Sequence, residues 1–420
     1  MHTFVTLLFT QGSSIAAGIA TAHVYGPVGK GSIALAGLLI TFAVTTSDGV
    51  RDAVAYQIGR EKRDPRAVWG TAIVVLSVTA PIGVAVLLIL WRLHPDQVAF
   101  LYAALAFPFG LYVQAVGVLY LLRDSVERIN VQNSATIGGG TSLVTLALVL
   151  IFHAPVSLVL AFWVLAYVAA AVWGASAVRE LIGGSALFRT PRLLREQLAF
   201  ASKVALSSNI TYLALRVDAF MVTALLAPAL LGIYTLALAT SELMFNLSKA
   251  VLWSSLGRIA TLDFADSAAL CARIVRSTIA MQFVVGTVVF LIGPMAITLV
   301  YGNRFEESGA VLRLLLPGVV FYSADGMLSS FIAVRAARPG LLLGLECVTL
   351  FVVAAITYVF ISRLGVFAGA LAHTVAFILA YAVKSAIFLR LTKLPIADVI
   401  VPRFADLPYS LRVRLRPTAQ

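Results

Sequence analysis

The sequence predicts an all-α, polytopic membrane protein of about 12 transmembrane helices. The first observation behind this is composition: 60% of the residues are hydrophobic, 12% are charged and the mean hydropathy is +0.97. A soluble protein would carry about a quarter of charged residues. The second observation is a series of long apolar runs, and the third is a regular alternation of positive charge between the connections that separate them. Most of the protein surface is therefore expected to face lipid.

Twelve apolar runs are long enough to cross a bilayer, because a hydrocarbon core of roughly 30 Å requires about 20 helical residues. The run 31–58 has extra length, which allows it to tilt or kink. The run 3–24 has no basic segment before it and a poor cleavage site after it, so we expect an uncleaved span. The predicted spans are residues 3–24, 31–58, 67–91, 96–121, 131–152, 155–178, 198–225, 229–252, 274–300, 309–333, 340–362 and 365–389.

Lysine and arginine gather in every second connection. The segment GREKRDPR at 59–66 is the densest example, and the C-terminal tail continues the pattern. The alternate connections hold only Lys30, Arg92, Arg304 and Arg363. Short cytoplasmic loops carry the excess of positive charge, and one missed helix would have inverted the alternation downstream. We therefore predict a bacterial inner-membrane protein with cytoplasmic N and C termini.

Twelve spans divide into two groups of six, and an even number of spans leaves both groups in the same orientation. An offset of 201 residues supports such a parallel repeat. It places Pro27, Gly31, Leu35 and Ala36 on Pro228, Gly232, Leu236 and Ala237. We expect an N-terminal six-helix bundle at 1–178, a cytoplasmic linker at 179–197, a C-terminal six-helix bundle at 198–390 and a cytoplasmic tail at 391–420. The tail either lies on the membrane surface or is disordered.

Composition and motifs argue against several classes of function. The net charge of +12 is explained by topology and by an anionic cytoplasmic leaflet of membrane lipids, so we expect no nucleic-acid partner. Cys271 and Cys347 have no metal-ligand spacing, which predicts neither a disulfide nor a metal site. HExxH, GxSxG and P-loop motifs are absent from the sequence, and no cofactor is expected. Transport, rather than catalysis, is the function that remains.

Ionisable residues inside the predicted spans are the candidate functional residues, because hydrocarbon disfavours charge. In the span 31–58, Asp48, Arg51 and Asp52 fall within one helical turn, where they either neutralise one another or line a cavity. In the span 198–225, Arg216 and Asp218 are two residues apart and point to different sides of a helix. Each therefore needs a partner elsewhere or a water-filled cavity, and we favour the cavity.

The remaining interior charges have alternatives that the sequence leaves open. Glu242 and Asp325 are either interhelical hydrogen-bonding groups or protonatable coupling sites. Lys203, Lys249 and Lys384 lie near span ends, where a lysine side chain is expected to extend to the interface. Three further residues belong to this group: Arg313 near the outer end of its span, Glu346 within 340–362, and His373, which we expect to be a packed, hydrogen-bonded residue.

Several segments resemble the Wzx-type polysaccharide and O-antigen flippases of the multidrug/oligosaccharidyl-lipid/polysaccharide exporter superfamily. They are VYGPVGKGSIALA at 24–36, RVDAFMVTALLAPALLGIYTLALATSEL at 216–243 and PMAITLVYGNRFEESGAVLRLLLPGVV at 294–320, with ARPGLLL at 337–343 and GVFAGALA at 365–372. The most specific piece is Arg216-x-Asp218 followed by Gly232-x-Tyr234. One departure is ECVTLFVVAAITYVF in the eleventh span, where such proteins often carry asparagines.

This resemblance implies two six-helix bundles around a central cavity and alternating access. Its substrate would be an undecaprenyl-pyrophosphate-linked oligosaccharide for surface polysaccharide biosynthesis, with a polysaccharide polymerase or glycosyltransferases as partners. We expect Arg216 and Arg51 to attract the pyrophosphate, with Lys203 and Arg313 as weaker candidates. An ion-coupled antiport cycle would use Asp218 or Glu242, and Asp325 is a further coupling candidate.

The alternative is a multidrug or small-molecule exporter of the same superfamily or of the major facilitator class, which also has twelve spans. A drug exporter would have less use for interior arginine than for interior acid.

Overall fold

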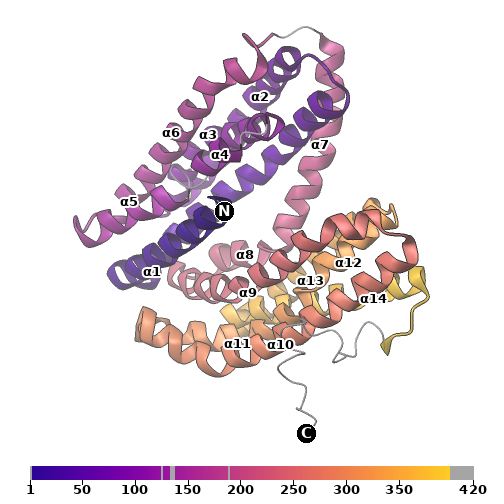
Figure 1. Cartoon of the computed structure of the whole chain (residues 1–420). Helices are drawn as coiled ribbons and strands as arrows, with labels where there is room; N and C mark the ends of the chain where they lie inside the picture. Colours follow the sequence, from indigo (N-terminus) through magenta and orange to yellow (C-terminus); the bar gives the residue numbers. More distant parts are fainter. Residues whose placement is uncertain (1, 124–125, 133–137, 188–189, 398–420) are drawn as a thin grey trace. The chain divides into compact units, whose positions relative to one another are not determined.

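The computed structural model describes residues 2–123, 126–132, 138–187 and 190–397, and within these ranges it contains helices and no strand (Figure 1). Side chains of residues 2–8 are not among those described, and the predicted tail at 391–420 lies largely outside the described residues. The α-helices are α1 (His2–Ala55), α2 (Pro65–Leu93), α3 (Val98–Leu122), α4 (Val126–Val131), α5 (Gly139–Leu150), α6 (Val156–Ile182), α7 (Pro191–Ala214), α8 (Val217–Leu225), α9 (Pro228–Thr261), α10 (Phe264–Tyr301), α11 (Glu306–Tyr322), α12 (Asp325–Ser330), α13 (Pro339–Leu364) and α14 (Val366–Thr392). Two π-helical turns, Tyr56–Arg60 and Phe331–Arg335, follow α1 and α12, and a 3₁₀ turn, Asn303–Phe305, precedes α11.

The described helices account for the predicted crossings. Nine are long and apolar enough to span a membrane, and the bent pair α7 and α8 makes a tenth. One of the nine, α1, has 54 residues and would be about 81 Å long if straight, so it comprises two spans. The short apolar helix α5 corresponds to the predicted span 131–152. The predicted class, an all-α polytopic membrane protein, is confirmed.

The break within α1 follows from its sequence. Gly26 has φ 63° and ψ −164°, and Pro27 follows it. A residue before proline is disfavoured in the α region, and glycine tolerates positive φ. Lys30 Nζ donates to the carbonyl oxygen of Gly18 at 3.2 Å, although twelve residues of straight helix would separate the two by about 18 Å. The chain therefore folds back at Gly26.

Proline also begins several other helices. Pro65, Pro191, Pro228 and Pro339 each occupy the first position of their helix. Proline is tolerated there because its missing N–H would have no intrahelical partner. Hydropathy and proline positions together explain most of the helix boundaries.

The break between α7 and α8 was not predicted. The sequence predicts one span at 198–225, whereas the chain bends by 61° at residues 215–216. Neither glycine nor proline lies at this point, so local propensity gives no sign of it. As a consequence Asp218 lies in the first turn of a new helix.

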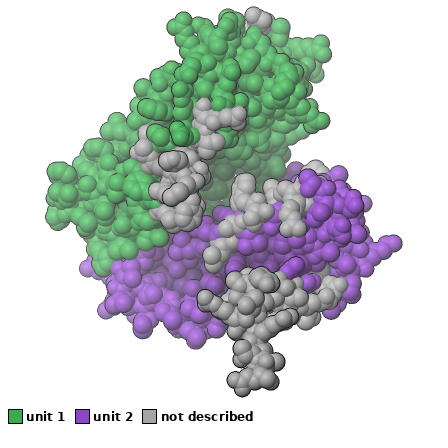
Figure 2. Space-filling model, in the orientation of Figure 1, with its two compact units in different colours: residues 1–216, 227–232 green, residues 217–226, 233–420 purple. Residues whose placement is uncertain are grey.

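The chain divides into two compact units, coloured in Figure 2. Unit 1 comprises residues 1–216 and 227–232, and unit 2 comprises residues 217–226 and 233–420. Helix α7 thus belongs to unit 1, whereas the sequence-based division assigns 198–225 to the C-terminal bundle. That division, and the cavity between the bundles, stay predictions.

In unit 1, α1 packs against α3, α5 and α7, and α3 packs against α2 and α6. Glycine allows the closest approach: a Cβ at Gly49 of α1 would lie 2.1 Å from the carbonyl oxygen of Ala201 in α7. The segment after α6 is bonded to α2, because Leu187 N donates to Arg66 O at 3.0 Å. The predicted linker is therefore held against α2 at Leu187.

The repeated turn residues meet within unit 1. A Cβ at Gly31 would lie 2.1 Å from Pro228 O, and a Cβ at Gly232 would lie 2.1 Å from Pro27 O. The four residues are those that the 201-residue offset superimposes, and their contacts are reciprocal. Such an exchange is what a local twofold relation between two copies of one turn produces, which supports the internal repeat.

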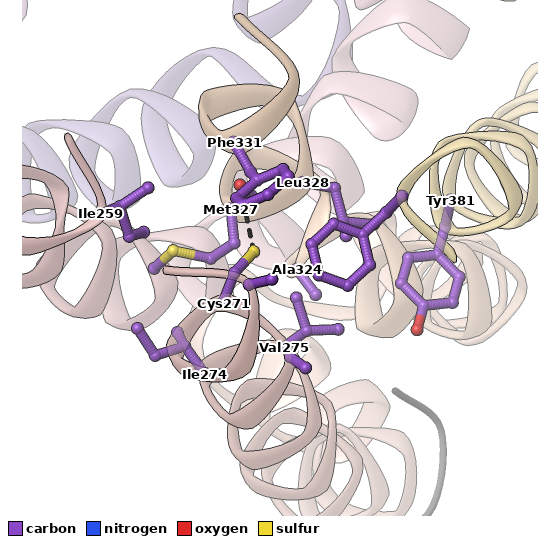
Figure 3. Packing of buried hydrophobic residues seen from close by; sticks show 12 residues of the cluster. Ile259, Cys271, Ile274, Val275, Ala324, Met327, Leu328, Phe331 and Tyr381 are labelled. Atoms are coloured by element: carbon purple, nitrogen blue, oxygen red, sulfur yellow. Dashed lines mark hydrogen bonds between the residues drawn. The ribbon is translucent and has the colours of Figure 1, made fainter. Parts of the chain in front are cut away.

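Unit 2 is built on α10, α11, α13 and α14, with α11 and α13 both packed on α14. Figure 3 shows one of its hydrophobic clusters, in which Cys271, Met327 and Phe331 meet. Cys271 Sγ lies 3.7 Å from Met327 O and is a free thiol, and Cys347 is also free. Elsewhere on α10, Leu299 is 78% exposed and Met295 is 68% exposed. Apolar exposure of this kind on a long helix suits a lipid environment.

Candidate functional site

A buried carboxylate lies inside unit 2. Asp218 of α8 is fully buried, and its Oδ2 lies 2.8 Å from His373 Nδ1 of α14. The hydroxyl of Tyr234, on α9, donates to the same oxygen. Within the described residues Asp218 Oδ1 has no hydrogen-bond partner. We call Asp218, Tyr234 and His373 the Asp218 cluster.

The local sequence explains how these three side chains meet. The break before α8 places Asp218 in a first helical turn, where unpaired backbone N–H groups favour negative charge. Gly369 lies four residues before His373, and a Cβ there would lie 3.0 Å from the Tyr234 hydroxyl. Glycine therefore makes room on α14 for the tyrosine ring, on the helix face that carries His373.

The Asp218 cluster can hold or release one proton. With one proton shared between them the pair of Asp218 and His373 is neutral, and without that proton the pair carries one negative charge. The unpartnered Oδ1 retains lone pairs that can accept a hydrogen bond or a monovalent cation. The arrangement is thus suited to ion exchange.

A second buried charge cluster lies further along α14. Lys384 is 1% exposed, and its Nζ lies 2.8 Å from Asp325 Oδ2 and 3.0 Å from Glu346 Oε1. Ser329 Oγ donates to Asp325 Oδ2 at 3.2 Å. We call Lys384, Asp325 and Glu346 the Lys384 cluster. One ammonium between two carboxylates leaves one negative charge when all three are ionised. Binding of one proton or monovalent cation would therefore make this cluster neutral as well.

Both clusters lie on the same face of α14. His373 and Lys384 are eleven residues apart, which is about three turns and about 16 Å. Phe377 lies between them, stacked on Tyr322 at a ring-centroid distance of 4.0 Å and lying 4.7 Å from the His373 ring. Phe245 packs edge-on against Tyr322. An aromatic layer therefore separates two acidic clusters.

A third polar group lies on α1 of unit 1. Arg51 Nη1 is 2.6 Å from Asp48 Oδ1, and Arg51 Nε is 2.8 Å from Asp52 Oδ1. Gln114 Nε2 of α3 donates to Asp48 Oδ1 at 2.9 Å. The geometry shows that the three side chains pair with one another, with one carboxylate in excess, and their cavity-lining role stays a prediction.

Comparison with known proteins identifies the family. Residues 8–247, more than half of the chain, match the family model described as "Polysaccharide biosynthesis protein". The chain belongs to this polysaccharide biosynthesis family. No curated protein matches the sequence significantly.

Solved structures show which fold this member of the polysaccharide biosynthesis family has. An inward-facing multidrug resistance MATE family transporter of the MOP superfamily is similar with a TM-score of 0.70 and 14% identity, over 93% of this chain and 99% of that one. The lipid II flippase MurJ, in an inward closed conformation, gives 0.71 and 12% identity over 94% and 88%. A MOP superfamily transporter from Pyrococcus furiosus gives 0.61 and 15% identity over 94% and 95%. Family and fold together confirm the resemblance to Wzx-type flippases.

The other predicted site residues of this family member are not members of the two clusters defined in unit 2. Arg216 is half-buried at the break before α8, and its Nη1 donates to Leu215 O at 3.3 Å. Glu242 is half-buried on α9, and Lys203 is exposed on α7. Arg313 of α11 donates to Phe290 O at 3.1 Å and lies 5.5 Å above the Phe290 ring. Their roles stay predictions.

Two residues of unit 2 acquire a significance that sequence reasoning missed. Lys384 was expected to extend to the interface, and this was wrong, because carboxylates from α12 and α13 meet its ammonium inside the unit. His373 is packed and bonded as expected, but its partner is the carboxylate of Asp218, 155 residues earlier. The eleven-residue spacing of His373 and Lys384, about three turns of one helix, was the sequence signal that both lie on the same face of α14.

Proposed function

We propose that this chain is a transporter that moves an undecaprenyl-pyrophosphate-linked oligosaccharide from the cytoplasmic to the outer leaflet of the bacterial inner membrane. The cycle is alternating access, coupled to a proton or sodium ion. Membership of the polysaccharide biosynthesis family, together with the fold shared with a lipid II flippase, is the observation that carries this proposal. Cytoplasmic termini and partners among polymerases or glycosyltransferases belong to the same proposal.

The ion-binding step is assigned to the Asp218 cluster and the Lys384 cluster. Each has one negative charge in excess when its histidine is neutral or its lysine is charged, and each contains a buried carboxylate oxygen without a described partner. Uncompensated charge inside a membrane protein is costly. Binding of one proton or cation therefore stabilises each cluster and supplies a free energy that can bias one conformation over another.

The substrate-binding step is assigned to arginine. Arg216 precedes Asp218 by two residues across the break between α7 and α8, so ion binding at Asp218 and pyrophosphate binding at Arg216 act on one short stretch of chain. Arg51 is held by two carboxylates through Nη1 and Nε, so it would bind phosphate through its remaining N–H groups or after one carboxylate moves away. Lys203 and Arg313 remain weaker candidates.

A deletion strain tests the function. We expect lipid-linked oligosaccharide to accumulate on the cytoplasmic side, inaccessible to an impermeant sugar-modifying reagent, and surface polysaccharide to disappear. Complementation with the wild type should restore both, and Arg216→Ala should not. Normal surface polysaccharide in the deletion strain would refute the proposal.

The same deletion strain distinguishes the proposed flippase function from a second candidate, multidrug export. The MATE transporter is as similar in fold as the flippase, with TM-scores of 0.70 and 0.71. A multidrug exporter predicts altered drug susceptibility and no accumulation of lipid-linked oligosaccharide.

A further inference from the structure

Unit 1 contains a cavity that none of the roles above uses. Its volume is about 330 Å³, and its lining comes from both arms of α1, from the start of α5 and from α6. Six serine and threonine residues contribute to the lining: Ser14, Thr21, Thr41, Thr141, Ser142 and Thr145. The volume falls within the usual range for small-molecule sites, which begins at about 300 Å³. For a membrane-spanning unit, the lining is rich in hydrogen-bonding groups.

Lys30 supplies the charge of this cavity. Its Nζ donates to Gly18 O at 3.2 Å, and the oxygen of Thr21 lies at 3.5 Å. The Thr21 hydroxyl itself donates to Ala17 O at 2.8 Å, so its lone pairs are left for the ammonium. Among the described residues, no carboxylate lies within ion-pair distance of Lys30. An ammonium has three donors, and these neutral contacts leave its charge uncompensated.

The internal repeat shows that the turn does not require a lysine. The 201-residue offset places Leu231, which is 1% exposed, at the position of Lys30. Both copies of the turn make the same reciprocal glycine contacts, although only the first carries a cation. The charge at Lys30 therefore needs an explanation other than the fold of the turn.

Two aromatic side chains complete the lining. Trp163 and Tyr167 of α6 contact the cavity, and Trp163 Nε1 donates to Thr145 Oγ1 at 3.0 Å, which fixes the indole. A flat ring beside several hydroxyl groups provides apolar contact and hydrogen bonds together, as a sugar ring requires.

We propose that the Lys30 cavity is a binding site for one singly charged acidic group, a carboxylate or a phosphodiester, on a sugar of the translocated oligosaccharide. This rests on the proposed function and deepens it. The carrier pyrophosphate bears more charge and suits bidentate arginine, whereas one lysine is a point charge matched to one anionic group. The proposal makes the protein selective for acidic saccharides.

Direct binding to the purified full-length protein in lipid nanodiscs tests the site. Isothermal titration with glucuronate, the methyl phosphodiester of glucose 1-phosphate and glucose separates the carboxylate, the phosphodiester and the neutral sugar. We expect at least one acidic sugar to bind at least tenfold more tightly than glucose, and its identity names the group. Lys30→Gln should weaken that binding at least tenfold, Lys30→Arg should retain most of it, and Lys393→Gln, at an exposed lysine, should leave it unchanged.

Three results would overturn the proposal: equal affinity for glucose and the acidic sugars, no detectable binding of any of them, or undiminished binding in Lys30→Gln. The comparison of sugars uses the wild type alone, so it decides even if the variants fail to fold. Translocation of a lipid-linked oligosaccharide is measured separately on the same preparation. Translocation without sugar binding contradicts only the site, and sugar binding without translocation contradicts only the proposed function.

Discussion

Replacement of Lys384 by methionine tests how unit 2 compensates its buried charges. The methionine keeps most of the side-chain volume but removes the ammonium that lies 2.8 Å from Asp325 and 3.0 Å from Glu346. Because Lys384 is 1% exposed, little water is available to take its place. Removing one partner of a buried ion pair costs about 3–5 kcal/mol. That range corresponds to roughly 150- to 5,000-fold in the folding equilibrium.

Asparagine at position 325 provides the contrasting variant. Asp325→Asn leaves Lys384 paired with Glu346 and removes the excess negative charge, so we expect a change within about 1 kcal/mol. The triple variant Lys384→Met, Asp325→Asn, Glu346→Gln has no charge at the cluster and should regain most of the lost stability. If the cluster binds the coupling ion, transport should fail in the single Asp325 variant and in the triple variant alike.

Stability can be followed with a thiol-reactive dye in a Cys347→Ser background, where the buried Cys271 reports unfolding. The dye should report earlier unfolding of Lys384→Met than of Asp325→Asn, because only the former leaves two buried carboxylates without a cation. A Lys384→Met protein as stable as Asp325→Asn at pH 7.5 would refute this reasoning.

Two further predictions concern contacts that are equally specific. Gly232→Ala should destabilise the protein, because the new Cβ would lie 2.1 Å from Pro27 O. Gly344→Ala, in open space on α13, should instead stabilise the protein by up to about 1 kcal/mol. Thermal unfolding of both variants tests the two expectations. Tyr234→Phe removes a hydrogen-bond donor to the buried Asp218 and should reduce ion-driven transport about tenfold or more, with little loss of protein. A pH profile of transport in proteoliposomes measures this effect. An unchanged profile would contradict the assignment of ion binding to the Asp218 cluster.

Much of the fold follows from rules that act locally. Hydropathy predicts the spans, and Gly26-Pro27 and Pro228 mark the turns that the repeat relates. The break at residues 215–216 could not be predicted, since it lies in an apolar stretch without proline or glycine. Tertiary packing, and not local propensity, decides whether such a helix continues.

The candidate site was predicted in part. The cost of interior charge pointed to Asp218 and Asp325, but it does not reveal partners that are distant in sequence, such as His373 and Lys384. The expectation for Lys384 used only its distance from a span end. Two carboxylates on neighbouring helices changed the outcome, and that information exists only in three dimensions.

Ion-driven translocation in proteoliposomes tests the central claim most directly. A fluorescent lipid-linked oligosaccharide is placed in both leaflets, a proton or sodium gradient is imposed, and the fraction accessible to an external reducing agent is followed. The account predicts gradient-dependent movement by the wild type and by Asp266→Asn, an exposed acidic residue on α10, and loss of gradient dependence in Asp218→Asn. Equal, gradient-dependent movement by Asp218→Asn would contradict it.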